Sequence, residues 1–139
     1  MYKKVLVAVD GSDSSQGVIQ LVKDLVKNGV IESITLISVA VVPTLPMEFV
    51  IDDHYNLEMV ASAVLNKVKA NLEDDGLIVG AVVVNGDPGV AISQYAQDNG
   101  FDLIILGSRG LSGVKGVVLG SVSHKVLHTA QCPVWIYKS

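Results

Sequence analysis

Five apolar runs, separated by segments with helical periodicity, constrain the fold of this chain more than any other feature. The runs are continuous and do not alternate with polar residues, so each predicted strand is buried on both faces. Buried strands that alternate with helices form a parallel sheet with helices on both sides, an α/β fold. The predicted strands are KKVLVAV (3–9), SITLISVAVV (33–42), LIVGAVVV (77–84), FDLIILG (101–107) and PVWIYK (133–138).

Helical segments fill four of the intervals between these strands. The helix after NGDP has Asp87 as its predicted N-cap and Pro88 at its first position. Gly29, Gly76 and Gly100 are predicted to end the first three helices. The segment PTLPMEFVIDDHYN, with two prolines and mixed polarity, is predicted to be irregular. The other predicted helices span 12–28, 57–75 and 121–131.

The strand order follows from two loops with unusual chemistry. One loop, VDGSDSS (9–15), follows the first strand, and the other (107–121) follows the fourth. Ligands of doubly wound sheets bind beyond the carboxyl ends of the strands, where the strand order reverses. If both loops face one crevice, the order is 3-2-1-4-5 and not the alternative 2-1-3-4-5. At 139 residues, the chain is predicted to be a single domain over 1–139.

Composition excludes several classes of function. The net charge of −4 argues against nucleic-acid binding, which needs a basic face. No apolar run reaches the roughly 18 residues of a membrane span, and the apolar start is too short for a signal peptide. The single cysteine, Cys132, fits a reducing cytoplasm. Half of the residues are hydrophobic and 17% are charged, which suggests additional burial at an oligomer interface.

The loop GSRGLSGVKGVVLGS (107–121) contains five glycines directly after a strand. A helix N-terminus offers free N–H donors and partial positive charge, which suit an anion. Gly120 would let a phosphate approach the backbone, and the Ser121 and Ser123 hydroxyls could contact it. Gly107 and Gly110 would allow the strand exit to curl into a nest of N–H groups. The alternative is a glycine loop that caps a helix and binds nothing. Side chains that could add positive charge are Arg109 and Lys115.

Other phosphate-binding and nucleophile motifs are absent from the sequence. There is no G-x-x-x-x-G-K-[ST] and no G-x-G-x-x-G after the first strand, which argues against a P-loop and a dinucleotide-binding fold. There is also no G-x-S-x-G elbow, so a hydrolase triad has no obvious nucleophile.

The spacing Gly107-x2-Gly110-x9-Gly120-Ser121 resembles the nucleotide-binding signature G-x2-G-x9-G-(S/T) of the universal stress protein family. The resemblance covers essentially the whole chain. It includes KKVLVAVDGSDSS at the start, NGDP before the third helix, and FDLIILGSRG through LGSVSHKVL to CPVWIYK at the end.

This resemblance implies a Rossmann-like sheet of order 3-2-1-4-5, of the adenine nucleotide alpha hydrolase type, and a homodimer. It also implies binding of ATP, with Mg2+ held through the phosphates. Asp10 would contact the ribose or adenine side, and the backbone of Ala8, Val9 and Val39 would border the base. Residues implied at the triphosphate are Gly107, Arg109, Gly110, Gly120, Ser121, Val122 and Ser123.

The last strand predicts the dimer interface independently of the resemblance. In the 3-2-1-4-5 order it is an edge, yet PVWIYK is apolar. Exposed apolar edges aggregate unless they are covered or paired. Pairing of Pro133–Lys138 with its copy across a two-fold axis would close the edge.

Two further features have competing interpretations. Asp10 could cap the first helix and need not contact a ligand. His124 and His128 have the i, i+4 spacing of a two-histidine metal clamp. Because no cysteine, carboxylate or third histidine has a matching spacing nearby, the sequence favours a solvated helix face and no metal site.

Three functions remain open. The leading hypothesis is a cytoplasmic, dimeric ATP-binding protein of the stress response, in which nucleotide occupancy is a regulatory signal. Without a convincing general base, little or no hydrolysis is expected, although AMP or a cyclic nucleotide could replace ATP. The second is an adenylating or pyrophosphatase enzyme. Enzymes of that class have the motif S-G-G-x-D-S after the first strand, and the run DGSDSS of this chain resembles it only in part. The third is a nucleotide-free interaction module. The sequence identifies no downstream protein partner.

Overall fold

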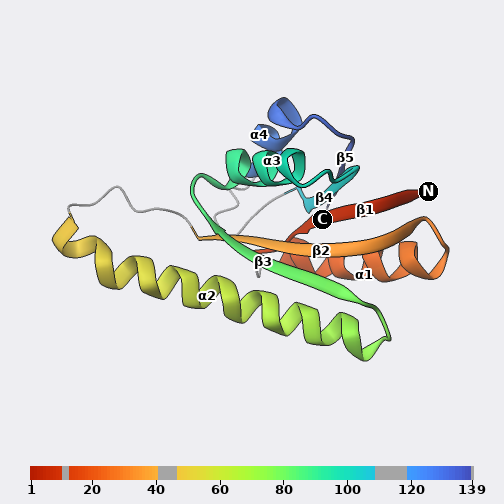
Figure 1. Cartoon of the computed structure of the whole chain (residues 1–139), viewed down its shortest axis with the longest axis horizontal. Coiled ribbons are helices and arrows are strands. Elements are labelled where there is room, and N and C mark those ends of the chain that lie inside the picture. The colour runs from red at the N-terminus through yellow and green to blue at the C-terminus, as the bar shows by residue number, and fades with distance from the viewer. Residues whose placement is uncertain (11–12, 41–46, 109–118, 139) are drawn as a thin grey trace.

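The computed structural model describes residues 1–10, 13–40, 47–108 and 119–138, with the side chains of 13–14 and 47–57 left out of the description. Strands and helices alternate along the chain as the apolar runs predict (Figure 1). The elements are β1 (Tyr2–Ala8), α1 (Asp13–Lys27), β2 (Ile31–Ala40), α2 (Met47–Asp74), β3 (Val79–Asn85), α3 (Pro88–Asp98), β4 (Leu103–Gly107), α4 (Ser121–Thr129) and β5 (Val134–Tyr137).

The five strands form one parallel sheet in the order β3-β2-β1-β4-β5, which confirms the predicted order. β1 lies at the centre, where Val5 pairs with Ile34 of β2 on one side and with Leu103 of β4 on the other. The chain runs outward from β1 to β3, then crosses back to β4 and β5. The reversal therefore falls between β1 and β4, the position at which α/β sheets bind ligands.

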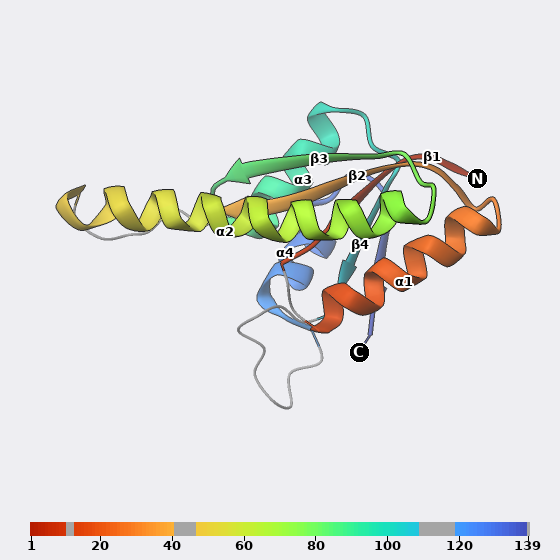
Figure 2. The ribbon, with the colours of Figure 1, turned by 90° about the horizontal axis from the view of Figure 1, so that it is seen from below.

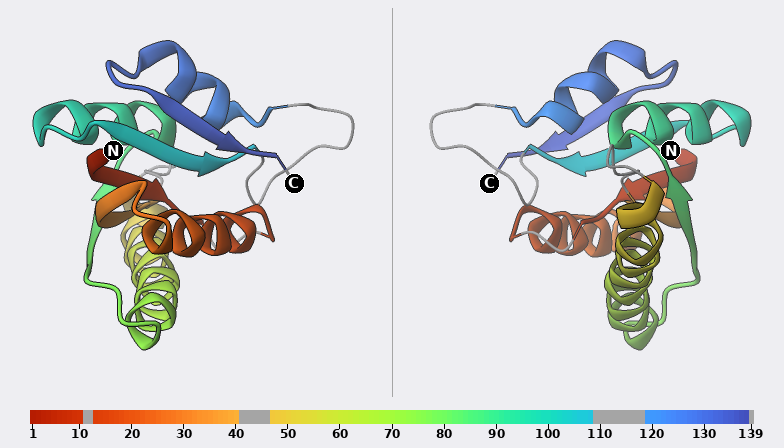
Figure 3. Two further views of the ribbon diagram at one scale, coloured as in Figure 1. Left: turned by 90° about the vertical axis from the view of Figure 1, so that its right-hand side faces the viewer. Right: turned by 90° about the vertical axis from the view of Figure 1, so that its left-hand side faces the viewer.

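Helices cover both faces of the sheet (Figures 2 and 3). Successive residues of a strand point to opposite faces, so Val5 and Val7 of β1 join one core cluster while Leu6 joins the other. The first cluster packs against α1 and α2, through residues such as Val22 and Leu72. The second packs against α3 and α4 and includes Ile92 and Val126. This two-sided burial is the reason for the continuous apolar runs.

The predicted glycine stops are confirmed. Gly29, Gly76 and Gly100 have φ angles of +72°, +85° and +68°, a region that favours glycine, and each follows the end of a helix. Pro88 is the first residue of α3, as predicted, and Asp87 is its N-cap. The Asp87 side chain makes no capping hydrogen bond, so the backbone, and not the carboxylate, defines this helix start.

The predicted boundary of the second helix is wrong at its N-terminal end. Residues 47–56 belong to the 28-residue helix α2 and are not irregular. Both prolines of the segment, at 43 and 46, precede the helix and therefore interrupt none of its hydrogen bonds. The mixed polarity was interpreted as a loop, but no glycine or proline separates Met47 from the rest of α2.

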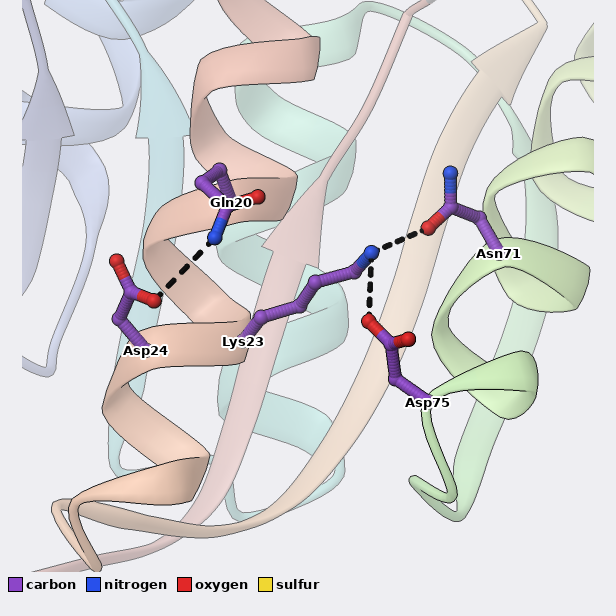
Figure 4. A network of polar contacts seen from close by, with 5 residues as sticks. All are labelled: Gln20, Lys23, Asp24, Asn71 and Asp75. Carbon is purple, nitrogen blue, oxygen red and sulfur yellow. Dashed lines mark hydrogen bonds and ion pairs between the residues drawn. The ribbon is translucent and has the colours of Figure 1, made fainter.

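Polar contacts join the two helices on one face of the sheet (Figure 4). Lys23 of α1 contacts Asp75 at 2.7 Å and donates to the Asn71 amide oxygen of α2 at 2.5 Å. The side chains of Lys23 and Asp75 are 21% and 52% exposed, so solvent screens the pair and its contribution is at most about 1 kcal/mol.

No helix in the described part of the chain has the length and apolar character needed to cross a membrane.

The edge strand β5 is partly covered on both faces by its own chain. Trp135 stacks edge-on against Tyr2, with ring centroids 5.4 Å apart, and Tyr137 lies against Gly17 of α1. A Cβ atom at Gly17 would lie 2.2 Å from the Tyr137 ring, so a larger residue at position 17 would displace this ring. Val134 and Ile136 pack on the opposite face of the sheet. Intramolecular packing therefore accounts for much of the apolar character that predicted a dimer, and the edge left open is the backbone of β5.

Candidate functional site

The candidate site lies at the carboxyl ends of β1 and β4, which are neighbours at the centre of the sheet. Val7 of β1 pairs with Ile105 of β4, so Asp10 after β1 and Ser108 after β4 leave the sheet at the same end. α4 begins at Ser121, and the Gly120 N–H donates to the Ser108 carbonyl at 2.5 Å. The two loops singled out in the sequence therefore begin next to each other, at the carboxyl end of the sheet.

The start of α4 presents uncapped N–H groups. Its N-cap, Gly120, makes no side-chain capping bond, and the intrahelical ladder starts with the His124 N–H donating to the Gly120 carbonyl. The N–H groups of Ser121, Val122 and Ser123 come before that bond and have no acceptor within the helix. Aligned peptide dipoles add partial positive charge there. This geometry suits an anion, as the sequence predicted.

Ser123 ties this helix start to the end of β4. Its hydroxyl is 2% exposed and donates to the Gly107 carbonyl at 2.8 Å and to the Ser108 carbonyl at 3.1 Å. The hydroxyl proton is therefore used within the protein, and the backbone N–H is what Ser123 can offer a ligand. The Ser121 side chain, by contrast, is exposed to solvent.

Asp10 is held by a reciprocal pair of hydrogen bonds with Ser15, a residue of the first turn of α1. The Asp10 N–H donates to the Ser15 hydroxyl at 3.1 Å, and that hydroxyl donates to a carboxylate oxygen of Asp10 at 2.9 Å. Ser15 is 5% exposed. These bonds join the end of β1 to the first turn of α1 and fix the direction of the Asp10 carboxylate. The run DGSDSS indicates that a serine could bond to Asp10, but the sequence does not identify which of its serines does so.

The residues expected around the base also lie at this end of the sheet. The Val9 N–H donates to the Ile37 carbonyl at 3.0 Å, which continues the β1–β2 pairing beyond Ala8. Val39 lies two residues further along β2 and pairs with Val84 of β3. Gly107 is the last residue of β4. The two other predicted phosphate residues, Arg109 and Gly110, lie outside the described residues.

Ser108 is a candidate that the sequence analysis missed. Its side chain is 1% exposed, and its hydroxyl has no hydrogen-bond partner among the described residues. Its backbone N–H donates to the Tyr137 carbonyl at 2.7 Å, so the residue connects β5 to the loop. A buried hydroxyl without a partner is energetically unfavourable. Ser108 lies inside the signature, between Gly107 and Gly110, and this position is the sequence feature that could have identified it as a site residue.

Two polar residues near the other end of the sheet have structural roles. The Asp102 carboxylate accepts hydrogen bonds from the Lys3 and Lys4 N–H groups at 3.0 and 3.1 Å, which joins the residue before β4 to β1. Cys132 is half-buried. Burial, with a smaller contribution from the Asp102 carboxylate, raises the pKa of the Cys132 thiol. A raised pKa disfavours the reactive thiolate.

An open hollow lies far from these loops, between the C-terminal part of α1, the start of β2 and the α2–β3 turn. Its lining includes Lys23, Asp75 and Ile78. Two of the charged groups in its lining, Lys23 and Asp75, already form an ion pair with each other. Because parallel sheets bind ligands at their carboxyl ends, we assign the candidate site to the β1 and β4 loops and not to this hollow.

Known proteins resemble this chain along nearly its whole length. The model of the universal stress protein family matches residues 1–138. Universal stress protein YxiE of Bacillus subtilis is 32% identical over 148 residues, a match that covers 99% of this chain and 100% of that protein. Universal stress protein MJ0531 of Methanocaldococcus jannaschii is 29% identical, with 99% of this chain and 83% of that protein covered.

Solved structures show the same fold. The structure of MJ0577, a universal stress protein of Methanocaldococcus jannaschii, matches this chain with a TM-score of 0.88 and 32% identity. The match covers 100% of this chain and 97% of that one. A universal stress protein solved in complex with cAMP has a TM-score of 0.70 and 25% identity, covering 97% and 96% of the two chains. With the family model matching nearly every residue, this chain belongs to the universal stress protein family.

Proposed function

We propose that this chain binds ATP between the β1 and β4 loops, and that nucleotide occupancy is its regulatory signal in a cytoplasmic stress response. The observation that carries the proposal is the start of α4, where three successive N–H groups lack intrahelical acceptors and the N-cap, Gly120, has no side chain to cap them. Phosphate is the anion that such a helix start commonly binds in α/β proteins. The complete signature from Gly107 to Ser121 supports the assignment.

Each part of the nucleotide would have its own contacts. The N–H groups of Ser121, Val122 and Ser123 would face the phosphates, with the Ser121 hydroxyl as a further donor. The Asp10 carboxylate, oriented by Ser15, would accept from the ribose hydroxyls. The backbone at Ala8, Val9 and Val39 would border the adenine. Arg109 and Gly110 complete the predicted phosphate contacts, and Mg2+ would be held through the phosphate oxygens.

The described residues favour binding over turnover. Hydrolysis of ATP needs a group that orients or deprotonates an attacking water. Asp10 is the carboxylate nearest in sequence to the site, and one of its oxygens already accepts the Ser15 hydroxyl proton. The Ser123 hydroxyl is directed at backbone carbonyls. We therefore expect bound ATP to remain largely intact.

The proposal includes a homodimer formed by the edge strand within Pro133–Lys138. β5 is the last strand of the described sheet and pairs with β4 only. Because both faces of β5 are partly covered by its own chain, the interface would rest on backbone pairing with a second copy more than on apolar side chains.

Calorimetric titration of the nucleotide-stripped chain with ATP and Mg2+ tests the binding site. Saturation at about one ATP per chain is expected for one site per sheet. Stable bound ATP over the time of the titration, checked by chromatography, would support regulation without turnover. Pyrophosphate release with a co-substrate would instead favour an adenylating enzyme. The absence of binding, with the fold intact, would favour the interaction module.

A second candidate ligand is a cyclic adenine nucleotide or AMP. It is favoured by the universal stress protein solved in complex with cAMP, which is 25% identical to this chain over 97% of its length. Parallel titrations with cAMP and AMP distinguish the ligands. A Ser121→Ala substitution should weaken ATP more than cAMP if the helix start binds the outer phosphates, because cAMP has one phosphate in place of three.

A further inference from the structure

His124 and His128 face one another across one turn of α4. Their Nε2 atoms lie 3.3 Å apart, with one donating a hydrogen bond to the other. The ring centroids are 4.4 Å apart and the ring planes meet at 61°. Both residues are exposed to solvent, so an incoming ion can reach both nitrogens. Residues four apart on a helix are neighbours on its surface, and here the two rings meet at the nitrogen atoms that can bind a metal.

The separation of the two nitrogens matches a shared metal ion. Imidazole nitrogens bind zinc at about 2.0–2.1 Å, and two such ligands at a tetrahedral angle lie about 3.3 Å apart. The observed 3.3 Å therefore needs little change in the nitrogen separation. We propose that His124 and His128 form a two-histidine binding site for a divalent transition metal of the zinc type.

Water would complete the coordination. Among the described residues, no group of three or more histidine, cysteine, aspartate or glutamate side chains could surround an ion. The site therefore supplies two protein ligands, and the metal keeps open positions. Nitrogen ligands select Zn2+, Ni2+ and Cu2+ over Mg2+, which prefers oxygen. Cu2+ should bind more tightly than Zn2+, following the general order of affinities for divalent metals.

A metal bound here would act on α4. Bridging residues 124 and 128 ties two successive turns of a nine-residue helix, whose first turn carries the uncapped N–H groups. An ion that binds the folded helix and not the unfolded chain stabilises the fold by mass action. Zinc should therefore raise the melting temperature of the protein, and Mg2+ at the same concentration should not do so through this pair.

The test uses the full chain without a histidine tag, titrated with ZnCl2 and with CuCl2 in a buffer that does not coordinate metals. About one ion per chain is expected for a single two-histidine site. Because the second imidazole binds within the same molecule, His124→Asn or His128→Asn alone should weaken binding by roughly 10²-fold. Copper bound through two nitrogens should also give a paramagnetic resonance spectrum that either substitution changes.

The third histidine provides the matched control. His54→Asn removes one imidazole from the chain and leaves the α4 pair intact, so zinc affinity and the zinc-dependent rise in melting temperature should persist. Circular dichroism of each variant checks that the fold is retained. The proposal is overturned if the His124 and His128 variants bind zinc as the unsubstituted chain does. It is overturned equally if the unsubstituted chain binds no zinc, or if His54→Asn alone removes the binding.

Discussion

Substitution of Ser123 by alanine should destabilise the protein, because this hydroxyl joins α4 to the exit of β4. The side chain is 2% exposed and donates at 2.8 and 3.1 Å to two carbonyls on the neighbouring loop. A hydrogen bond contributes about 1 kcal/mol net, and the Gly107 carbonyl would also lose this donor, whereas the Ser108 carbonyl keeps the Gly120 N–H as a donor. We expect a decrease of about 1–2 kcal/mol in the free energy of unfolding.

Thermal and urea unfolding of the two proteins measure this effect. For a chain of 139 residues, each kcal/mol corresponds to a decrease in melting temperature of about 3–5 °C. The midpoint of urea unfolding should fall while the slope stays constant, because the native surface is unchanged. ATP binding should weaken secondarily, since the helix start is less firmly positioned.

Ser121→Ala is the matched control on the same helix. The Ser121 side chain is exposed at the first helical position, so stability should change by less than about 0.5 kcal/mol. If its hydroxyl contacts a phosphate, ATP affinity should fall by about tenfold, the loss of one charge-assisted hydrogen bond. An unchanged unfolding midpoint for Ser123→Ala would refute the role of that hydroxyl as a tie between strand and helix.

Three further predictions concern the site, the edge strand and the thiol. Gly120 has φ −70° and ψ 165°, which valine also adopts, so Gly120→Val should fold normally yet bind ATP at least about tenfold more weakly in calorimetry; equal affinity would contradict phosphate approach at this position. The carbonyls of Pro133 and Tyr137 face β4, so strand alternation turns the Ile136 N–H outward. Ile136→Pro should therefore dissociate the proposed dimer in sedimentation, whereas Ile136→Ala keeps it; a dimer with proline would exclude this edge. The alkylation rate of Cys132 should keep rising at pH values where an ordinary thiol is already fully ionised, because burial and the Asp102 carboxylate raise the pKa of this thiol. A pH profile of the rate identical to that of the urea-unfolded chain would contradict this.

Local sequence patterns determined most of the architecture. Continuous apolar runs predict strands buried on both faces, and the glycines at 29, 76 and 100 predict where helices end. Both patterns can be recognised within a short stretch of sequence. The spacing from Gly107 to Ser121 located the candidate site for the same reason. The N-terminal boundary of α2 was missed because helical continuity through 47–56 depends on the whole helix and not on the local polarity.

Tertiary structure alone decided which polar groups meet. The Asp102 carboxylate bonds to N–H groups 98 and 99 residues away, and Ser123 donates to carbonyls 15 and 16 residues before it. Trp135 could be interpreted from the sequence as part of an interface, but in the fold it stacks on Tyr2 at the other end of the chain. Periodicity gives the face on which a side chain lies. Its partner depends on how distant segments pack, and only the folded chain brings those segments together.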